Sequence, residues 1–116
     1  MGTHTPWGAA DHTERVAPGI IRYSTPSHGG FHVAPTQNAK VHPAWRLADG
    51  WYEEDCDWAI VAFTFPDLFI KDYAQAVDTA RNWHPHAYMK ITGTELRPDE
   101  SYLLRTHPAW PIRKYA

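Results

Sequence analysis

The stretch Trp51-Tyr52-Glu53-Glu54-Asp55-Cys56-Asp57-Trp58 runs directly into Ala59-Ile60-Val61-Ala62-Phe63-Thr64-Phe65. Four acidic side chains stand among three aromatic ones, and the densest apolar run of the chain follows at once. A continuous apolar run is typical of a strand that is buried on both faces. Residues 51–65 therefore predict the central strand of the fold, with a cluster of carboxylates where this strand enters the core.

The segments before this stretch predict a β-hairpin and an arm. Residues 19–25 and 31–34 are rich in β-branched and aromatic side chains, which favour strands, and Gly29 and Gly30 in the turn 26–30 are expected to supply positive φ. Residues 1–18 predict an irregular arm that Trp7 attaches to the core. Pro43 suits the first position of a short helix over 43–48, which Asp49-Gly50 would end.

The segments after the stretch predict helices and one last strand. Apolar side chains recur every three or four residues over 67–83, the pattern of an amphipathic helix. A second short helix is expected over 85–91, closed by Gly93, and a strand over 101–105. The prolines in 106–116 predict an irregular tail. The sum is an α+β fold: a small antiparallel sheet of about four strands with one long amphipathic helix packed on a face.

Length and composition favour one cytoplasmic domain spanning residues 1–116. The 116 residues are 43% hydrophobic, which is enough for one core. No apolar run approaches the roughly 18–20 residues that span a bilayer, and residues 1–10 show no pattern of an export signal. The single cysteine, Cys56, cannot form an internal disulfide, which fits a reducing compartment. We therefore expect a cytoplasmic protein that does not contact a membrane.

The charges are distributed unevenly along the chain. The formal net charge is −2, but residues 41–80 hold eight acidic and two basic side chains, while residues 81–116 hold six basic and three acidic ones. No segment has the dense Lys/Arg patch of a protein that binds the phosphate backbone. Direct nucleic-acid binding is therefore not expected. A local acidic face is the better description.

The acidic stretch is the first candidate site. Carboxylates flanked by large aromatic side chains suit a docking surface for a basic partner, because buried aromatics carry much of the energy of protein interfaces. The predicted partner-binding residues are Trp51, Tyr52, Glu53, Glu54, Asp55 and Trp58, joined by His28 and Phe31 of the hairpin turn. This interpretation needs no cofactor and no catalytic residue.

Two other interpretations of the same residues remain open. Imidazole and carboxylate groups together suit zinc, manganese or iron, so His28 and His32 with Glu54 or Asp55 can form the metal site of a small hydrolase or nuclease. Alternatively, His28 closes the turn, His32 packs on the sheet and the acids only line the entry of the strand. Cys56 lies between Asp55 and Asp57, whose charges disfavour the thiolate, so a cysteine hydrolase is not expected.

Several separated motifs occur together in a fixed order: Thr5-Pro6-Trp7-Gly8, Ser27-His28-Gly29-Gly30-Phe31-His32, Asn38-Ala39 and Gly50-Trp51-Tyr52-Glu53-Glu54-Asp55. Trp58, Phe65-Pro66 and Glu100-Ser101-Tyr102 follow them. Over about residues 5–105 the chain resembles a family of uncharacterised small proteins carried on plasmids and integrative elements of proteobacteria. The end departs from this pattern, because Trp110-Pro111-Ile112-Arg113 stands where an apolar closing strand is expected.

The resemblance implies a setting rather than an activity. Small single-domain proteins of mobile elements often act by binding a host protein, and some inhibit restriction or CRISPR systems. We therefore expect a non-enzymatic accessory protein of a mobile genetic element that binds a host or element-encoded protein. An inhibitor of host defence (anti-CRISPR or anti-restriction) is the specific form of this expectation, and the small metal-dependent hydrolase or nuclease is the alternative.

Overall fold

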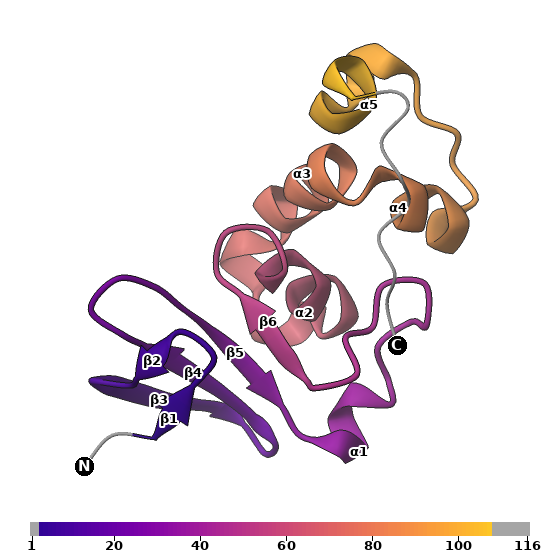
Figure 1. The fold of residues 1–116 in the computed structure, drawn as a ribbon. Coiled ribbons are helices and arrows are strands. Elements are labelled where there is room, and N and C mark those ends of the chain that lie inside the picture. Colours follow the sequence, from indigo (N-terminus) through magenta and orange to yellow (C-terminus); the bar gives the residue numbers. More distant parts are fainter. Residues whose placement is uncertain (1–2, 108–116) are drawn as a thin grey trace.

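One four-stranded antiparallel sheet is the frame of the fold. The computed structural model describes residues 3–107, and its main sheet has the strand order β3-β4-β5-β6 (Figure 1). The strands are β3 (His12–Ala17), β4 (Ile20–Ser24), β5 (Gly29–Val33) and β6 (Trp51–Glu53). Most of the helices follow the last strand in the sequence and lie to one side of the sheet (Figure 1). The predicted α+β class with about four antiparallel strands is confirmed.

The predicted irregular arm, residues 1–18, is wrong for most of its length. A small hairpin of β1 (His4–Thr5) and β2 (Gly8–Ala9) comes first, and β3 then pairs with β4 along the edge of the main sheet. The hydroxyl of Thr5 donates to the carbonyl of Gly8 at 2.7 Å, which closes the first hairpin. β3 has few apolar side chains because both of its faces are largely exposed, and this is why its sequence resembles a loop.

The hairpin of β4 and β5 confirms the predicted strand pair, but not the predicted role of its glycines. Gly29 and Gly30 lie inside β5, paired with Ser24 and Tyr23, and neither has positive φ. The turn itself is closed by Thr25, whose backbone N–H donates to the carbonyl of His28 at 2.7 Å. The glycines are needed for space, as shown below, rather than for a left-handed turn.

The long central strand predicted over 51–65 is wrong. β6 ends at Glu53, a turn follows over 54–57, and the apolar run forms the helix α2 (Trp58–Thr64). Four consecutive residues of α2, from Ala59 to Ala62, are fully buried. A helix that is enclosed on all sides has no polar stripe, so its sequence cannot be distinguished from that of a buried strand by periodicity.

The second half of the chain is helical. Two 3₁₀ turns, η1 (Pro66–Leu68) and η2 (Ile70–Asp72), precede α3 (Tyr73–Trp83), so the predicted helix over 67–83 begins later than expected. α4 (Pro85–Thr92) confirms the second short helix, and Gly93 ends it with φ of 73°. α2 contacts β5 and β6, and α3 packs against α2. The helix that adjoins the sheet is therefore the buried α2 rather than the amphipathic one.

Two short predicted elements have a different structure. The strand expected over 101–105 is the helix α5 (Tyr102–Thr106), which follows η3 (Pro98–Glu100); the Ser101 hydroxyl caps it by accepting from the N–H of Leu104 at 3.4 Å. The helix expected over 43–48 is a set of turns, and a single helical turn, α1 (Pro35–Asn38), precedes it. The predicted tail, 106–116, starts at the last residue of α5, and residues 108–116 lie outside the described residues.

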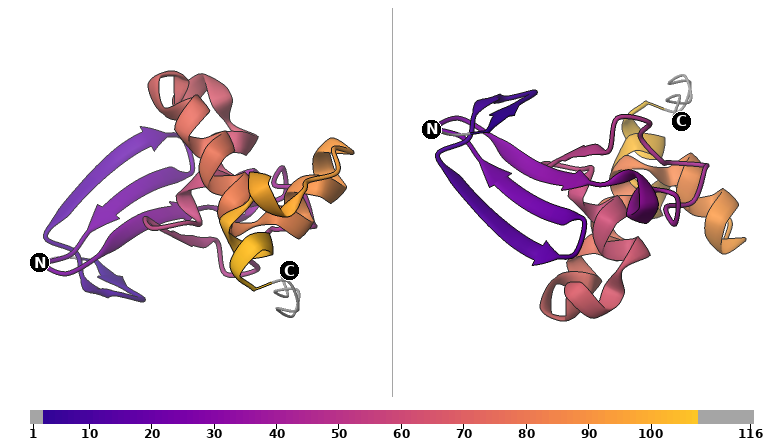
Figure 2. Two further views of the ribbon diagram at one scale, coloured as in Figure 1. Left: turned by 90° about the horizontal axis from the view of Figure 1, so that it is seen from above. Right: turned by 90° about the horizontal axis from the view of Figure 1, so that it is seen from below.

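Most of the core lies between the sheet and the helices (Figure 2). Its largest fully buried side chains include Trp45, Tyr52 and Ile60. The Tyr52 hydroxyl donates to Asn38 Oδ1 and accepts from the N–H of Leu47, so this buried phenol ties β6 to the preceding turns. Over residues 3–107 no helix has the length and apolar character that crossing a membrane requires.

Candidate functional site

His28 lies at the centre of the acidic cluster. It is the last residue of the turn between β4 and β5, and its backbone N–H donates to the Thr25 hydroxyl at 3.0 Å. That hydroxyl also donates to the His28 carbonyl at 2.8 Å. The Thr25 side chain thus satisfies both backbone groups of His28, which fixes the residue while its imidazole stays available for other contacts.

Three carboxylates surround the imidazole. The distances are 3.1 Å from His28 Nε2 to Glu53 Oε1 and 3.9 Å from the same nitrogen to Asp55 Oδ2. On the other side of the ring, His28 Nδ1 lies 3.7 Å from Glu54 Oε2. Glu53 occupies this place because β6 pairs with β5 in the register Gly30↔Glu53. The pairing continues for one residue, since the N–H of Glu54 donates to the carbonyl of Gly29 at 3.0 Å.

Aromatic rings support the cluster from the side. Trp7, in the loop of the first hairpin, has its ring centroid 6.0 Å from that of His28 and 5.7 Å from that of Trp51, both edge to face. Trp51 also contacts Tyr23, with 5.3 Å between centroids. Gly30 makes this possible, because a Cβ there would clash with the Trp7 ring. The prediction that Trp7 attaches the N-terminal segment to the rest of the fold agrees with these contacts.

The carboxylates raise the pKa of His28 above its usual value of 6.5, chiefly through the hydrogen bond with Glu53. Folding therefore favours the imidazolium. Its contribution to stability is fully present below pH 6.5 and is lost as the pH rises through the folded-state pKa. We predict that NMR titration of a metal-free sample gives His28 a pKa above its usual value of 6.5, and that Glu53→Gln lowers it. Equal pKa values in wild type and variant would contradict this account.

The structure separates the predicted docking residues into an exposed group and a buried group. Glu53, Glu54 and Asp55 have side chains that are 40%, 49% and 63% exposed. Tyr52 is fully buried and Phe31 is 8% exposed, so their predicted role as docking anchors is wrong. Their side chains point to the helical side of the sheet because neighbouring residues of a strand face opposite ways. Trp51 and Trp58 are half-buried, and Trp58 packs against the core.

The predicted metal ligands are only partly brought together. The ligand atoms of His28, Glu53 and Asp55 lie within 4.8 Å of one another, so these three residues can hold one ion. His32 does not belong to this group. Its ring packs at a tilt of 49° against Trp51, with 4.5 Å between centroids, which agrees with the interpretation that His32 packs on the sheet. Glu54 was predicted as a ligand but lies on the opposite side of the imidazole, and Glu53 belongs to the group of possible ligands instead.

Sequence reasoning missed the buried pair of Asp57 and His84. Their side chains are 9% and 1% exposed, and His84 Nε2 lies 3.5 Å from Asp57 Oδ1 and 3.3 Å from the carbonyl oxygen of Cys56. Asp57 precedes α2, and His84 links α3 to α4. The pair therefore fixes the end of the turn that carries Glu54 and Asp55. Because 27 residues separate the two, no local pattern could have indicated it.

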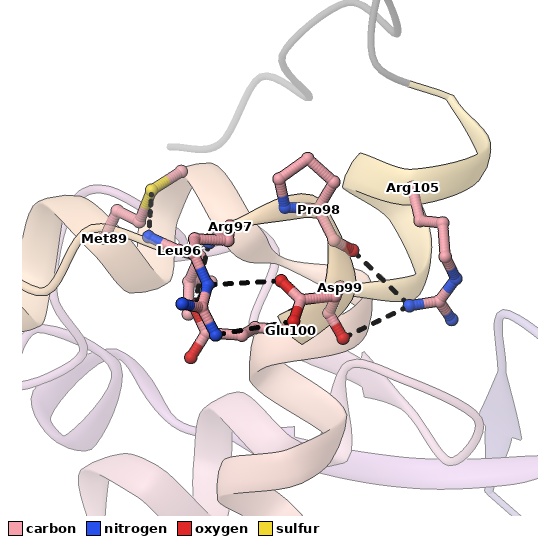
Figure 3. A network of polar contacts seen from close by, with 7 residues as sticks. All are labelled: Met89, Leu96, Arg97, Pro98, Asp99, Glu100 and Arg105. Carbon is pink, nitrogen blue, oxygen red and sulfur yellow. Dashed lines mark hydrogen bonds and ion pairs between the residues drawn. The ribbon is translucent and has the colours of Figure 1, made fainter.

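A second polar region lies at the opposite end of the chain. It borders a hollow of about 440 Å³, lined by Asp78, Arg81, Asn82, Asp99, Glu100 and Arg105. Most of its charges already have partners, and Arg81 contacts Asp78 at 2.6 Å. Arg97 contacts Asp99 at 3.2 Å, and this pair is drawn in Figure 3. Arg105 donates to the carbonyl oxygens of Pro98 and Asp99, each at 3.4 Å, and lies over the Tyr102 ring, 5.8 Å from its centroid. These contacts hold η3 against α5, and we assign this region a structural role.

Comparison with known families agrees with the resemblance of the motifs. The family model described as "Domain of unknown function (DUF7007)" matches residues 1–110. The chain belongs to this family. No curated protein and no solved structure gives a significant match. The DUF7007 match includes the whole acidic cluster together with Trp7, so the cluster is part of the family domain rather than an addition to it.

Proposed function

We propose that this DUF7007 protein is a binding protein whose carboxylate surface docks a basic segment of a host or element-encoded protein. The carboxylate surface consists of Glu53, Glu54 and Asp55 around His28. The observation that carries the proposal is the exposure of all three acidic side chains beside a single histidine. Even with His28 protonated, the surface keeps an excess of negative charge, which complements lysine and arginine side chains and speeds their association.

The surroundings of this surface support a role in binding. The pairing of β5 with β6 holds the backbone of Glu53 and Glu54 in place, and the ring of Trp7 packs edge to face against His28. A surface that is already ordered loses less conformational entropy when a partner docks. The fixed carboxylates can therefore accept bidentate hydrogen bonds from arginine without a large rearrangement.

We further propose that the protein acts in the setting of a mobile element of proteobacteria, as an inhibitor of host defence in the cytoplasm. The motifs from Thr5 to Tyr102 that resemble such proteins support this setting. A plasmid-transformation assay tests it directly. A host with an active restriction or CRISPR system should accept a targeted plasmid more often when it expresses the wild-type protein than when it expresses the surface variant described next.

The docking proposal predicts a loss of partner binding when the surface charge is reversed. The variant Glu54→Lys/Asp55→Lys changes two exposed side chains and leaves the hydrogen bond between His28 and Glu53 in place. In affinity capture from host lysate, the proteins retained by the wild type should be absent, while the melting temperature stays unchanged. Asp67→Lys/Glu95→Lys, which makes the same charge change at exposed positions outside the surface, should retain the partner. An unchanged set of captured proteins in the surface variant would exclude this docking mode.

A metal-dependent hydrolase or nuclease is the second candidate, because the ligand atoms of His28, Glu53 and Asp55 lie within 4.8 Å of one another. Their imidazole and carboxylate groups suit zinc or manganese, and water can complete the coordination. Calorimetric titration with Zn²⁺ or Mn²⁺ should then show one site, which His28→Ala removes and His4→Ala, at an exposed histidine of β1, preserves. Absence of binding, or equal binding by both variants, would eliminate this candidate.

A further inference from the structure

β3 is a sheet edge whose pairing is incomplete in the single chain. It is the terminal strand of the β3-β4-β5-β6 sheet, and within residues 3–107 no other strand pairs with its outer edge. Residues 12–15 are exposed although their side chains alternate between the two faces of the sheet. Neither the helices nor the first hairpin buries these positions. A row of unpaired backbone groups on such an edge is a template for another strand.

The symmetry of a dimer limits how two β3 strands can pair. An antiparallel edge-to-edge dimer has a two-fold axis perpendicular to the sheet, so each side chain stays on its own face in both copies. Opposed residues must share a face, and residues of one strand alternate between faces. The axis therefore passes between the two copies of one residue, which face each other. Each residue before this position faces the residue of the second copy that lies equally far after it.

Among the registers with the axis at one of the exposed residues 12–15, only one places opposite charges directly across from each other. With the axis at Glu14 or at Arg15, that charged side chain would face itself. With the axis at His12, no opposite charges face each other. With the axis at Thr13, Asp11 faces Arg15 of the second copy and His12 faces Glu14, and each contact occurs twice. Opposite charges directly across strands stabilise a sheet, whereas like charges destabilise it.

We propose that β3 is a self-association edge, and that two copies of this chain pair through it with the two-fold axis at Thr13, forming one continuous eight-stranded sheet. The sequence of this edge favours a second copy over a different protein, because residues 11–15 carry both halves of every charge pair. The register irregularity between Arg15 and Ala17 limits the contact at its end. The proposal is independent of the carboxylate surface, whose residues lie at and beyond β6 on the other edge of the sheet.

A charge-swap experiment tests the register. Asp11 and Arg15 are four residues apart on an extended segment, about 13 Å, so their charges do not meet within one chain. By sedimentation velocity, the wild type should form a dimer of twice its 13.3 kDa mass as concentration rises. Asp11→Arg or Arg15→Asp alone should raise the dimer Kd by about tenfold, because both symmetric attractions become repulsions. The double swap Asp11→Arg/Arg15→Asp should restore the dimer, and Glu95→Arg, in the helical half, should leave it unchanged.

A cross-linking experiment gives a second readout that does not depend on charge. In a Cys56→Ser background, Thr13→Cys places two thiols beside the proposed axis, where facing Cβ atoms are about 5 Å apart. A short bis-maleimide should then link two chains faster than it links a Glu95→Cys control. A protein that stays monomeric, a dimer that tolerates both single reversals, a double swap that fails to restore it, or equal cross-linking of the two cysteine variants would overturn the proposal.

Discussion

Replacing His84 by Ala should lower the free energy of unfolding by about 2–4 kcal/mol, the cost of removing one partner from a buried polar contact together with the ring that fills its space. His84 is 1% exposed at its side chain, and the carboxylate of Asp57 beside it is 9% exposed. Without the imidazole, that carboxylate loses a neighbour that water cannot easily replace. The cavity left by the ring, which also faces Trp45, adds to the loss.

Urea denaturation measures this effect, and two variants show whether the pair is responsible. His4→Ala, at an exposed position, should change the stability by less than about 0.5 kcal/mol. In a double-mutant cycle, His84→Ala and Asp57→Ala should lose less together than the sum of their separate losses, because each single change already breaks the same contact. Additive losses, or a loss below about 1 kcal/mol for His84→Ala, would show that the two side chains do not stabilise one another.

Gly30→Val is expected to lower the free energy of unfolding by about 3 kcal/mol, at the upper end of the usual cost of overpacking. A Cβ at position 30 would clash with the backbone carbonyl of Tyr52 and with the Trp7 ring. The carbonyl belongs to the strand ladder, so Trp7 must move. Its edge contacts with His28 and Trp51 should then be lost.

The control for this substitution is Ser27→Val, which adds a β-branched side chain at an exposed position of the same turn. It should change the stability by less than about 0.5 kcal/mol. A shift of the His28 ring resonances in Gly30→Val, but not in Ser27→Val, would report the displacement of Trp7. Equal stabilities of the two variants would refute the steric explanation. The explanation from positive φ is already excluded, because Gly30 is in extended strand backbone.

The glycines illustrate how a sequence signal can be correct while its cause is wrong. Two glycines beside a turn predicted a special backbone requirement near residues 29 and 30. The structure shows the requirement to be space: a Cβ at Gly29 would lie 2.8 Å from the Tyr23 carbonyl, and one at Gly30 would clash with Trp7. The rings and carbonyls that occupy this space come from other segments, so the sequence around the glycines could not reveal them.

The sequence predicted where the candidate site lies, but it did not predict which carboxylate makes the shortest contact with His28. The proximity of His28 to residues 53–55 was predicted because the hairpin turn that holds His28 and the start of the predicted central strand belong to one sheet. The choice of Glu53 over Glu54 for the shortest contact depends on the register Gly30↔Glu53. A shift of one residue would reverse it, because neighbouring side chains of a strand face opposite ways.

Local residue preferences are enough to predict several features of this protein. These are the hairpin of β4 and β5, the helix after His84-Pro85 with its glycine end at Gly93, the α+β class and the concentration of acids before α2. Each follows from a local preference, such as the fixed φ of proline or the freedom of glycine.

Three features depend on contacts between segments that are distant in the sequence. These are the helix over residues 58–64, the strand over residues 12–17 and the contact of Asp57 with His84. The first segment is apolar throughout because the core encloses it, and the second is polar because it lies on an exposed edge. In both segments, the proportion of apolar side chains reflects how much of the segment is buried rather than whether it forms a helix or a strand. Hydrophobic burial is non-directional, so contacts with the surrounding segments determine whether such a segment forms a helix or a strand.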